Sequence, residues 1–225
     1  NAASFQKAVL AQDSIVTAFG QAFTSATAVA ESNPAPTSLG GITVSIEDSA
    51  GVARNAPLFF VSPSQVNFVM PEGTAPGVAT ITVIGGPEPF RTSVLVKPVA
   101  PGLFAVSGLA AANVFTFRGS DVTATNTIRA AAGGSLELAP IDLGNEEQKV
   151  FLILYGTGIR HHGGAVTAQI GSATVPAAYA GPQGAFAGED QINIELPRSL
   201  RGAGTVDVTL TVDGQTTNVV KIRIQ

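Results

Sequence analysis

Short stretches in which apolar and polar residues alternate recur along most of this chain of 225 residues. A period of two indicates β-strands with one buried face, and no stretch keeps the 3.6-residue period of an amphipathic helix over several turns. The first half has alternating stretches at residues 15–19, 42–46, 66–70, 79–84 and 93–97. The second half has them at residues 151–155, 166–170, 192–196, 206–212 and 219–224. The pattern predicts an all-β protein.

The two sets of predicted strands follow the same order, and one phrase occurs in both. The sequence SQVNFVMP at residues 64–71 reappears as DQINIELP at residues 190–197. Self-similarity in a fixed order indicates duplicated structural units. Each copy is predicted to be a small antiparallel sandwich. Turns between paired strands are predicted at Gly85-Gly86 and at Asp213-Gly214.

Alternation also assigns the two faces of the repeated strand. Its core face is predicted to carry Val66, Phe68 and Met70 in the first copy and Ile192, Ile194 and Leu196 in the second. The opposite face is predicted to carry Gln65 and Asn67 in the first copy and Gln191, Asn193 and Glu195 in the second. Pro71 and Pro197 then end the strands, because proline has no N–H group to donate to a neighbouring strand.

Several motifs in this order resemble a known kind of domain. They are a strand that ends in Phe-Gly or Tyr-Gly, an alternating strand, the repeated phrase and a glycine-led hairpin. This order resembles that of IPT/TIG domains, which have an immunoglobulin-like fold. The stretches SIVTAFG, APLFFVSPSQVNFVMP, LYGTGIR and YAGPQGAFAGEDQINIELP also resemble an uncharacterised C-terminal domain of secreted acidobacterial proteins. The resemblance implies immunoglobulin-like repeats and an extracellular or cell-surface location, and it implies no particular activity.

We therefore expect two tandem immunoglobulin-like β-sandwiches, at residues 1–98 and 149–225, joined by an ordered connector at residues 99–148. The connector is rich in Gly, Ala and Thr, but a structureless segment of this length is unusual inside a compact protein. Residues 114–117 and 135–138 are plausible short strands. The connector is expected to pack on both sandwiches.

Charge is sparse in this chain, because 12% of residues are charged and the formal net charge is -4. No basic surface is expected to attract nucleic acid or an anionic membrane. No window reaches the roughly 18 consecutive apolar residues of a membrane helix. Cysteine is absent, which excludes disulfides, thiolate metal ligands and a cysteine nucleophile. A chain that begins at Asn1 is expected to be a processed chain or part of a longer protein.

The two histidines, His161 and His162, are adjacent in the stretch RHHGG. Imidazole titrates near pH ~6.5, so the pair could form a pH-sensitive loop or half of a metal site. Adjacent residues on an extended backbone point apart, and the chain has no further His or Cys to complete a metal site. We expect a solvated loop tip. A G-x-S-x-G motif for a serine nucleophile is also missing, and no catalytic residue is assigned.

Neighbouring carboxylates occur at Glu47 and Asp48, at Glu146 and Glu147, and at Glu189 and Asp190. We expect all of them to be solvated turn or loop residues rather than a general acid and base.

Calcium is a further alternative, for which oxygens could come from Asp121, Glu189, Asp190 and Asn193. Calcium sites gather six to eight oxygen ligands, and these stretches lack the regular aspartate spacing of a calcium-binding loop. No metal site and no cofactor is predicted.

Exposed aromatic rings form the platform of many carbohydrate-binding modules. This chain has no Trp, and its tyrosines are Tyr155 and Tyr179. A carbohydrate-binding platform would be expected around Tyr179 and Phe186. The neighbouring Phe59 and Phe60 point to opposite faces of any strand, and we expect the other sandwich to cover the outer ring.

These features predict a non-catalytic extracellular module that serves adhesion, spacing or docking in a bacterial secreted or surface protein. Its expected partner is a protein or polysaccharide at the cell surface, with no nucleic-acid binding and no membrane insertion. The alternatives are a carbohydrate-binding module attached to a secreted enzyme, a subunit of a self-assembling surface polymer and a hydrolase with a noncontiguous site. Lys221 and Arg223 on the last strand are expected to discourage pairing at a sheet edge. The oligomeric state stays open.

Overall fold

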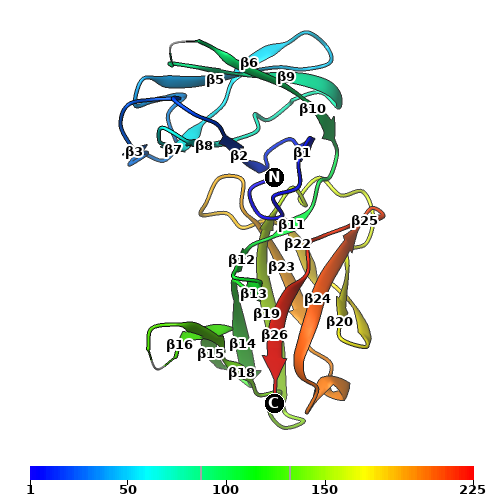
Figure 1. Cartoon of the computed structure of the whole chain (residues 1–225). Coiled ribbons are helices and arrows are strands. Elements are labelled where there is room, and N and C mark those ends of the chain that lie inside the picture. The colour runs from blue at the N-terminus through cyan, green and yellow to red at the C-terminus, as the bar shows by residue number, and fades with distance from the viewer. Residues whose placement is uncertain (87, 132) are drawn as a thin grey trace. The chain divides into compact units, whose positions relative to one another are not determined.

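A computed structural model of the chain describes residues 1–86, 88–131 and 133–225 (Figure 1). It is built from β-strands, and the only helix among the described residues is a 3-10 helix at Arg198–Leu200. The prediction of an all-β protein is confirmed.

The chain divides into two compact units. The first unit comprises Asn1–Ala100 together with Gly184–Glu189. The second unit comprises Pro101–Gln183 together with Asp190–Gln225. Each unit is described by itself below.

One sheet of the first unit has the strand order β1-β10-β9-β5-β4, with β6 paired to β5. These strands are β1 (Val9–Ala11), β4 (Ser38–Leu39), β5 (Ile42–Glu47), β6 (Ala53–Asn55), β9 (Gly77–Ile84) and β10 (Phe90–Lys97). A second sheet has the order β2-β8-β7-β3. Its strands are β2 (Ile15–Phe19), β3 (Ala28–Val29), β7 (Leu58–Val61) and β8 (Gln65–Val69). Side chains from both sheets, such as Ile42 and Phe68, share one apolar core, as in a β-sandwich.

The second unit contains a sheet in the order β15-β14-β19-β23-β22, with β11 paired to β19. These strands are β11 (Gly102–Leu103), β14 (Ala112–Arg118), β15 (Asp121–Asn126), β19 (Gln148–Thr157), β22 (Tyr179–Pro182) and β23 (Asp190–Glu195). Strands β16 (Ile128–Ala130) and β17 (Leu136–Leu138) form a separate hairpin.

A further sheet of the second unit has the order β12-β13-β26-β24-β20-β21, with β18 paired to β26 and β25 paired to β24. Its strands are β12 (Ala105–Val106), β13 (Leu109–Ala110), β18 (Pro140–Ile141), β20 (Thr167–Ile170), β21 (Ala173–Pro176), β24 (Gly204–Val212), β25 (Gln215–Thr216) and β26 (Val220–Ile224). Neighbouring strands β5, β9 and β10 of the first unit correspond in order to β20, β24 and β26 here.

The repeated phrase occupies equivalent strands with the same register in the two units. In the first unit β8 pairs with β2, and Gln65 lies opposite Phe19. In the second unit β23 pairs with β19, and Gln191 lies opposite Tyr155. The predicted core residues of both copies are buried, namely Val66, Phe68, Met70, Ile192, Ile194 and Leu196. The duplication inferred from the sequence therefore agrees with the way these strands pair.

The outward amides of the phrase also make the same contact twice. Gln65 Nε2 donates to Asn67 Oδ1 over 2.8 Å. Gln191 Nε2 donates to Asn193 Oδ1, also over 2.8 Å. Residues two positions apart on a strand point to the same face, which brings each pair together. The faces that alternation assigned to this strand are confirmed.

The stretch at residues 99–148, expected as a connector, contributes strands to the sheets of the second unit. Its predicted strands are observed as β14 and β17. Strand β14 lies between β15 and β19, and β13 and β18 run parallel to β26. The boundary between the units lies at Ala100 and Pro101, so the division differs from the expected three parts. Pairing satisfies backbone groups along β19 and β26 that would otherwise be unpaired at a sheet edge.

This pairing also corrects the interpretation of the last strand. Strand β26 has neighbours on both sides, so it is not a sheet edge that Lys221 and Arg223 protect. Instead, Lys221 lies opposite Asp207 on β24, and its Nζ is 2.5 Å from Asp207 Oδ1. A cross-strand ion pair explains the position of this lysine.

The predicted turn at Asp213-Gly214 is confirmed, since both residues have positive φ angles of 46° and 75°. Positive φ at both central residues is typical of a tight hairpin turn, and glycine adopts it at little cost. The connection after Gly85 is longer than predicted, because β10 begins only at Phe90.

Candidate binding site on an open sheet face

A hollow lies on one face of the β15-β14-β19-β23-β22 sheet of the second unit. Alternation sends Val114, Leu152 and Ile192 into the core, so their neighbours along each strand point to the opposite face. The hollow has a volume of about 310 Å³, near the lower end for ligand pockets. Its lining residues are Phe115, Phe117, Phe151, Ile153, Tyr155, Gln191 and Asn193.

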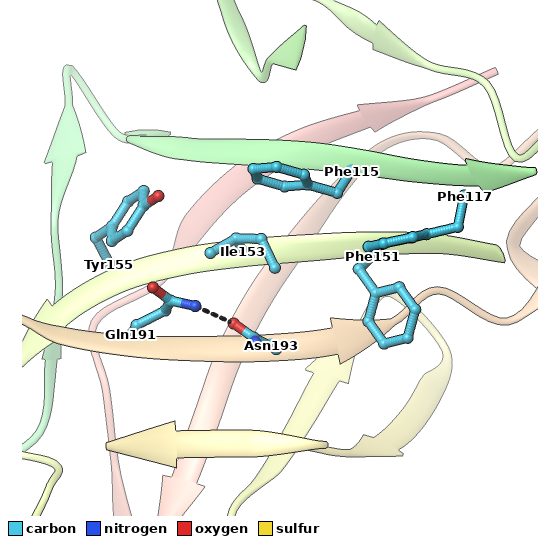
Figure 2. Close-up of a pocket in the computed structure, with 7 residues that line it drawn as sticks. All are labelled: Phe115, Phe117, Phe151, Ile153, Tyr155, Gln191 and Asn193. Atoms are coloured by element: carbon cyan, nitrogen blue, oxygen red, sulfur yellow. Dashed lines mark hydrogen bonds between the residues drawn. The ribbon is translucent and has the colours of Figure 1, made fainter. Parts of the chain in front are cut away.

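Aromatic rings surround an aliphatic floor in this hollow. Figure 2 shows Ile153 in the middle of the group, with Tyr155 and Phe117 toward opposite ends. Ile153 is only 6% exposed although it is on the outer face of the sheet. The rings of Phe117 and Phe151 meet edge to face, with centroids 5.6 Å apart and planes at 84°. Such a contact restricts the orientation of both rings, so their apolar surface stays at the opening of the hollow.

Amides and a phenol give the hollow fixed polar groups. The Tyr155 hydroxyl donates to Asn113 Oδ1 over 2.8 Å. Asn113 Nδ2 donates in turn to Asn126 Oδ1 over 2.7 Å. On the other side, the Gln191 to Asn193 hydrogen bond holds two amides side by side (Figure 2). These contacts orient the polar groups before any ligand arrives.

The lining carries no formal charge. The nearest charged pair along the strands is Lys149, opposite Phe117, and Glu195, opposite Phe151. Their Nζ and Oε2 atoms are 3.7 Å apart, so the two charges compensate each other. The hollow thus offers apolar surface and neutral hydrogen-bonding groups. A lining of this kind can contact an uncharged ligand through both its apolar and its polar parts.

The corresponding face of the first unit is built differently. Strand β2 ends its sheet in the described part of the chain, whereas the equivalent β19 is followed by β14 and β15. Phe115 and Phe117 therefore have no counterpart beside β2 among the described strands. The added hairpin makes the hollow a property of the second unit.

A larger apolar groove of about 470 Å³ lies in the first unit. Its lining includes the core residues Phe68, Ile81 and Val83 as well as the exposed rings of Phe5 and Phe19. It therefore opens onto the sandwich core, in contrast to the hollow on the outer sheet face.

The histidine loop is anchored, contrary to the expected solvated tip. His161 and His162 are both half-buried. The ring of His162 has Nδ1 at 2.6 Å from the Gly164 carbonyl oxygen and Nε2 at 3.1 Å from that of Ala180. The N–H groups of Gly163 and Gly164 donate to the carboxylate of Asp213. These contacts hold the loop in one conformation and account for the two histidines by a structural role.

The prediction of solvated carboxylates is wrong for Asp48. Its side chain is buried and receives hydrogen bonds from Arg54 and from the backbone N–H groups of Ala50, Val52 and Ala75. The N–H groups of Ala75 and Val52 contribute most to lowering its pKa to about 2. Asp48 thus joins neighbouring loops by satisfying buried backbone donors.

Asp190 is the second exception, and it is fully buried. Its carboxylate accepts hydrogen bonds from Ile159 N at 2.7 Å and from Arg160 Nε at 2.6 Å. Burial raises the pKa of Asp190, while the charge of Arg160 and the hydrogen bonds oppose that effect. The pair fixes the loop after β19 to the start of β23. Glu47, Glu146 and Glu147 are exposed, as predicted.

Two of the residues considered for calcium have other partners, since Asp190 is bound to Arg160 and Asn193 is bound to Gln191. Asp121 is exposed at the start of β15, and Glu189 is half-buried. Across residues 1–86, 88–131 and 133–225, no three His, Asp or Glu side chains gather as metal ligands would.

The aromatic candidates are only partly brought together. Tyr155 lines the hollow, and Tyr179 lies beside it on β22, opposite Asn193. Phe186 belongs to the segment Gly184–Glu189 of the first unit and is not among the residues that line the hollow. Phe59 and Phe60 are half-buried at an irregularity in β7.

Sequence reasoning missed the three phenylalanines of the hollow. Phe115 and Phe117 alternate with buried Val114 and precede a turn at Gly119 and Ser120. That spacing is the local signal of an outward aromatic face on the first strand of a hairpin.

Comparisons with known proteins assign no family to the chain. No protein-family model matches the chain, and a search of curated proteins finds no match. Within the part of the chain that the structure describes, no helix is long and apolar enough to cross a membrane.

Proposed function

We propose that the chain is a non-catalytic docking module of a bacterial secreted or cell-surface protein and that it binds its partner through the aromatic hollow of the second unit. The observation that carries this proposal is the hollow itself, an uncharged cavity on an outer sheet face with ordered amides at its border. Large apolar groups on an outer face of a protein are typical of interaction sites.

The architecture proposed with this function is a pair of tandem immunoglobulin-like repeats of the IPT/TIG kind. Equal register in β2–β8 and β19–β23 supports a duplication, as does the matching order of β5-β9-β10 and β20-β24-β26. Repeats of this kind serve as spacers that present a binding face at a distance from an anchor point.

The proposed extracellular or cell-surface location rests on composition and resemblance. A charged fraction of only 12% leaves uncharged polar side chains to cover the sheets. The resemblance of the motifs to a C-terminal domain of secreted acidobacterial proteins supports the same location.

The proposal can be tested by displaying the chain on non-adherent bacterial cells and measuring their retention under flow. Surfaces coated with extracellular polysaccharide, with matrix protein or with nothing are compared. Display should increase retention on a coated surface, and Phe117→Ala should abolish the increase. Phe19→Ala is the matched control, because Phe19 occupies in the first unit the position of Tyr155.

Two results would overturn the proposal. One is the absence of any gain in retention on every coating. The other is a gain that Phe117→Ala leaves intact, which would place the binding surface elsewhere.

A module attached to a secreted enzyme for carbohydrate binding is the second candidate. The specific observation in its favour is that aromatic rings and amides line the same hollow.

A further inference from the structure

The structure assigns a ligand class to the hollow: we propose that it binds a short segment of a neutral sugar chain. This inference rests on the proposed docking function and makes it more specific. It depends on Phe115, Phe117, Phe151 and Tyr155 as stacking surfaces and on Gln191 and Asn193 as hydrogen-bonding groups.

The rings match the apolar side of a sugar. A pyranose ring has faces made of C–H bonds, and the electron-rich face of an aromatic ring attracts their slight positive charge. Phe117 is 37% exposed and stands at one end of the hollow, while Tyr155 stands toward the other (Figure 2). Rings at both ends with Ile153 as the floor suit an extended ligand that lies along the sheet.

The amide pair matches the hydroxyl side of a sugar. Gln191 Nε2 is used in the bond to Asn193 Oδ1. That bond uses one of the two N–H groups of Gln191, so Gln191 Oε1 is left as an acceptor and the Asn193 Nδ2 group as a donor, held next to each other. Neighbouring sugar hydroxyls can donate to the first and accept from the second, and such bonds give specificity when the site is shielded from water.

The absence of charged side chains in the lining favours a neutral ligand. Anionic polymers such as nucleic acids or acidic polysaccharides are bound mainly through Lys and Arg, and the lining contains neither. Lys149 at the border is paired with Glu195. An acidic ligand would therefore lose water without gaining a compensating positive partner.

A second copy of the chain is the less favourable occupant. A stable protein interface uses roughly 20–30 residues on each side. The hollow is lined by seven residues, and polar amides occupy one border. Its size and polarity suit a small ligand better than a flat partner.

The experiment is a titration of the full chain with neutral oligosaccharides, namely gluco-, manno- and xylo-oligosaccharides, and with the acidic oligogalacturonate and heparin. Binding is followed by NMR of the Ile153 methyl group, because this side chain forms the floor of the hollow. At least one neutral oligosaccharide should shift the Ile153 signal in a saturable way. The acidic oligosaccharides should bind at least roughly tenfold more weakly.

Variants then locate the site. Phe117→Ala and Gln191→Ala should each weaken binding by roughly tenfold, which corresponds to one lost stacking or hydrogen-bonding contact. Phe19→Ala should leave affinity unchanged. Backbone NMR spectra are used to check whether each variant is folded. If a variant is unfolded, the titration of the wild-type chain, followed at Ile153, still tests sugar binding at the hollow.

Failure of this inference can be told apart from failure of the docking function. If no neutral oligosaccharide shifts Ile153 while matrix proteins or a second copy do, the ligand class is wrong and docking through the hollow stands. If a sugar binds without any change at Ile153, the assigned site is wrong. If nothing of any class perturbs Ile153, both proposals fall.

Discussion

Asp48 and Asp190 are buried charges in a chain that has few charged residues. Each carboxylate lies at the end of a loop and accepts hydrogen bonds from backbone N–H groups that would otherwise be buried without partners. An unpaired buried donor costs more than a typical hydrogen bond contributes, so these two residues stabilise loop conformations that alternation cannot specify.

Asp48 should make the stability of the first unit sensitive to acid. Its pKa is about 2 in the folded protein, below the ~3.9 of an unfolded chain. The stabilisation is therefore present above about pH 4 and is lost as the pH falls toward 2. Urea denaturation at several pH values should show a steeper loss between pH ~4 and ~2 for the wild type than for Asp48→Asn. Equal slopes for the two proteins would contradict the assignment.

The Arg160–Asp190 pair should be strongly coupled. Arg160→Met leaves the buried carboxylate without its cation, which is expected to cost about 3–5 kcal/mol in the free energy of unfolding. Asp190→Asn should cost less, because the charge it leaves unpaired, the Arg160 guanidinium, is partly exposed to solvent, whereas the Asp190 carboxylate is fully buried. In the double variant, part of the stability lost through Arg160→Met should be recovered. A double-mutant cycle of unfolding free energies, measured by denaturation in guanidinium chloride, would show this coupling. Strictly additive losses would mean that the two side chains act independently.

At the scale of elements, the repeated strand is amphipathic in the same way in both units. Strands β8 and β23 bury one set of side chains and carry a half-buried Gln and Asn on the other face. A slip of one residue would exchange these faces, so the register is strongly determined. The identical pairing of β8 with β2 and of β23 with β19 follows from this requirement.

Substitutions on the two faces of β23 should have unequal effects. Ile194 is fully buried, and Ile194→Ala should lower the free energy of unfolding by about 2–5 kcal/mol. Asn193→Ala removes one partly exposed hydrogen bond and should cost less than about 1.5 kcal/mol. Chemical denaturation of both variants measures the difference. Similar losses would show that the outer face is also packed for stability.

At the scale of the whole molecule, the two units share an order of strands, and the aromatic hollow lies in the second unit. The hairpin β14–β15 extends the second unit beside β19, while β2 lacks such neighbours among the described strands. The first unit has its own core, which includes Phe68 together with residues of β5 and β9. A unit with its own core can differ from the other in its outer strands without disturbing the other unit's packing.

A core substitution in the first unit should act mainly within that unit. Phe68 is fully buried, so Phe68→Ala should cost about 3–5 kcal/mol. Hydrogen exchange measured by mass spectrometry should show reduced protection in β5, β8 and β9, with β19 and β23 largely unchanged. The Ile153 methyl signal serves as a control for the hollow. An equal loss of protection in both units would show that they unfold together.

Much of the strand pattern was predictable from the sequence. The alternating stretches at residues 15–19 and 151–155 correspond to β2 and to the middle of β19, and both faces of the repeated phrase were assigned correctly. Short strands with weak alternation, such as β3 and β4, were not found. The hollow was not predicted, because the aromatic platform was expected around Tyr179 and Phe186 and neither residue lines it. The alternation of Phe115 and Phe117 with Val114 indicates an outward aromatic face, but it does not record that Phe151 and Tyr155 lie on the neighbouring strand.

By itself, the sequence determined the all-β class, the repeat and the buried face of each strong strand, because side-chain alternation is a local property of the backbone. The tertiary structure alone decided that residues 101–148 join the second unit, that Asp190 meets Arg160, and that Phe115 and Phe151 face one another across β14 and β19. These outcomes depend on which strand edges pair. Edge pairing is settled by backbone hydrogen bonds between residues far apart in the chain, and no local pattern records it.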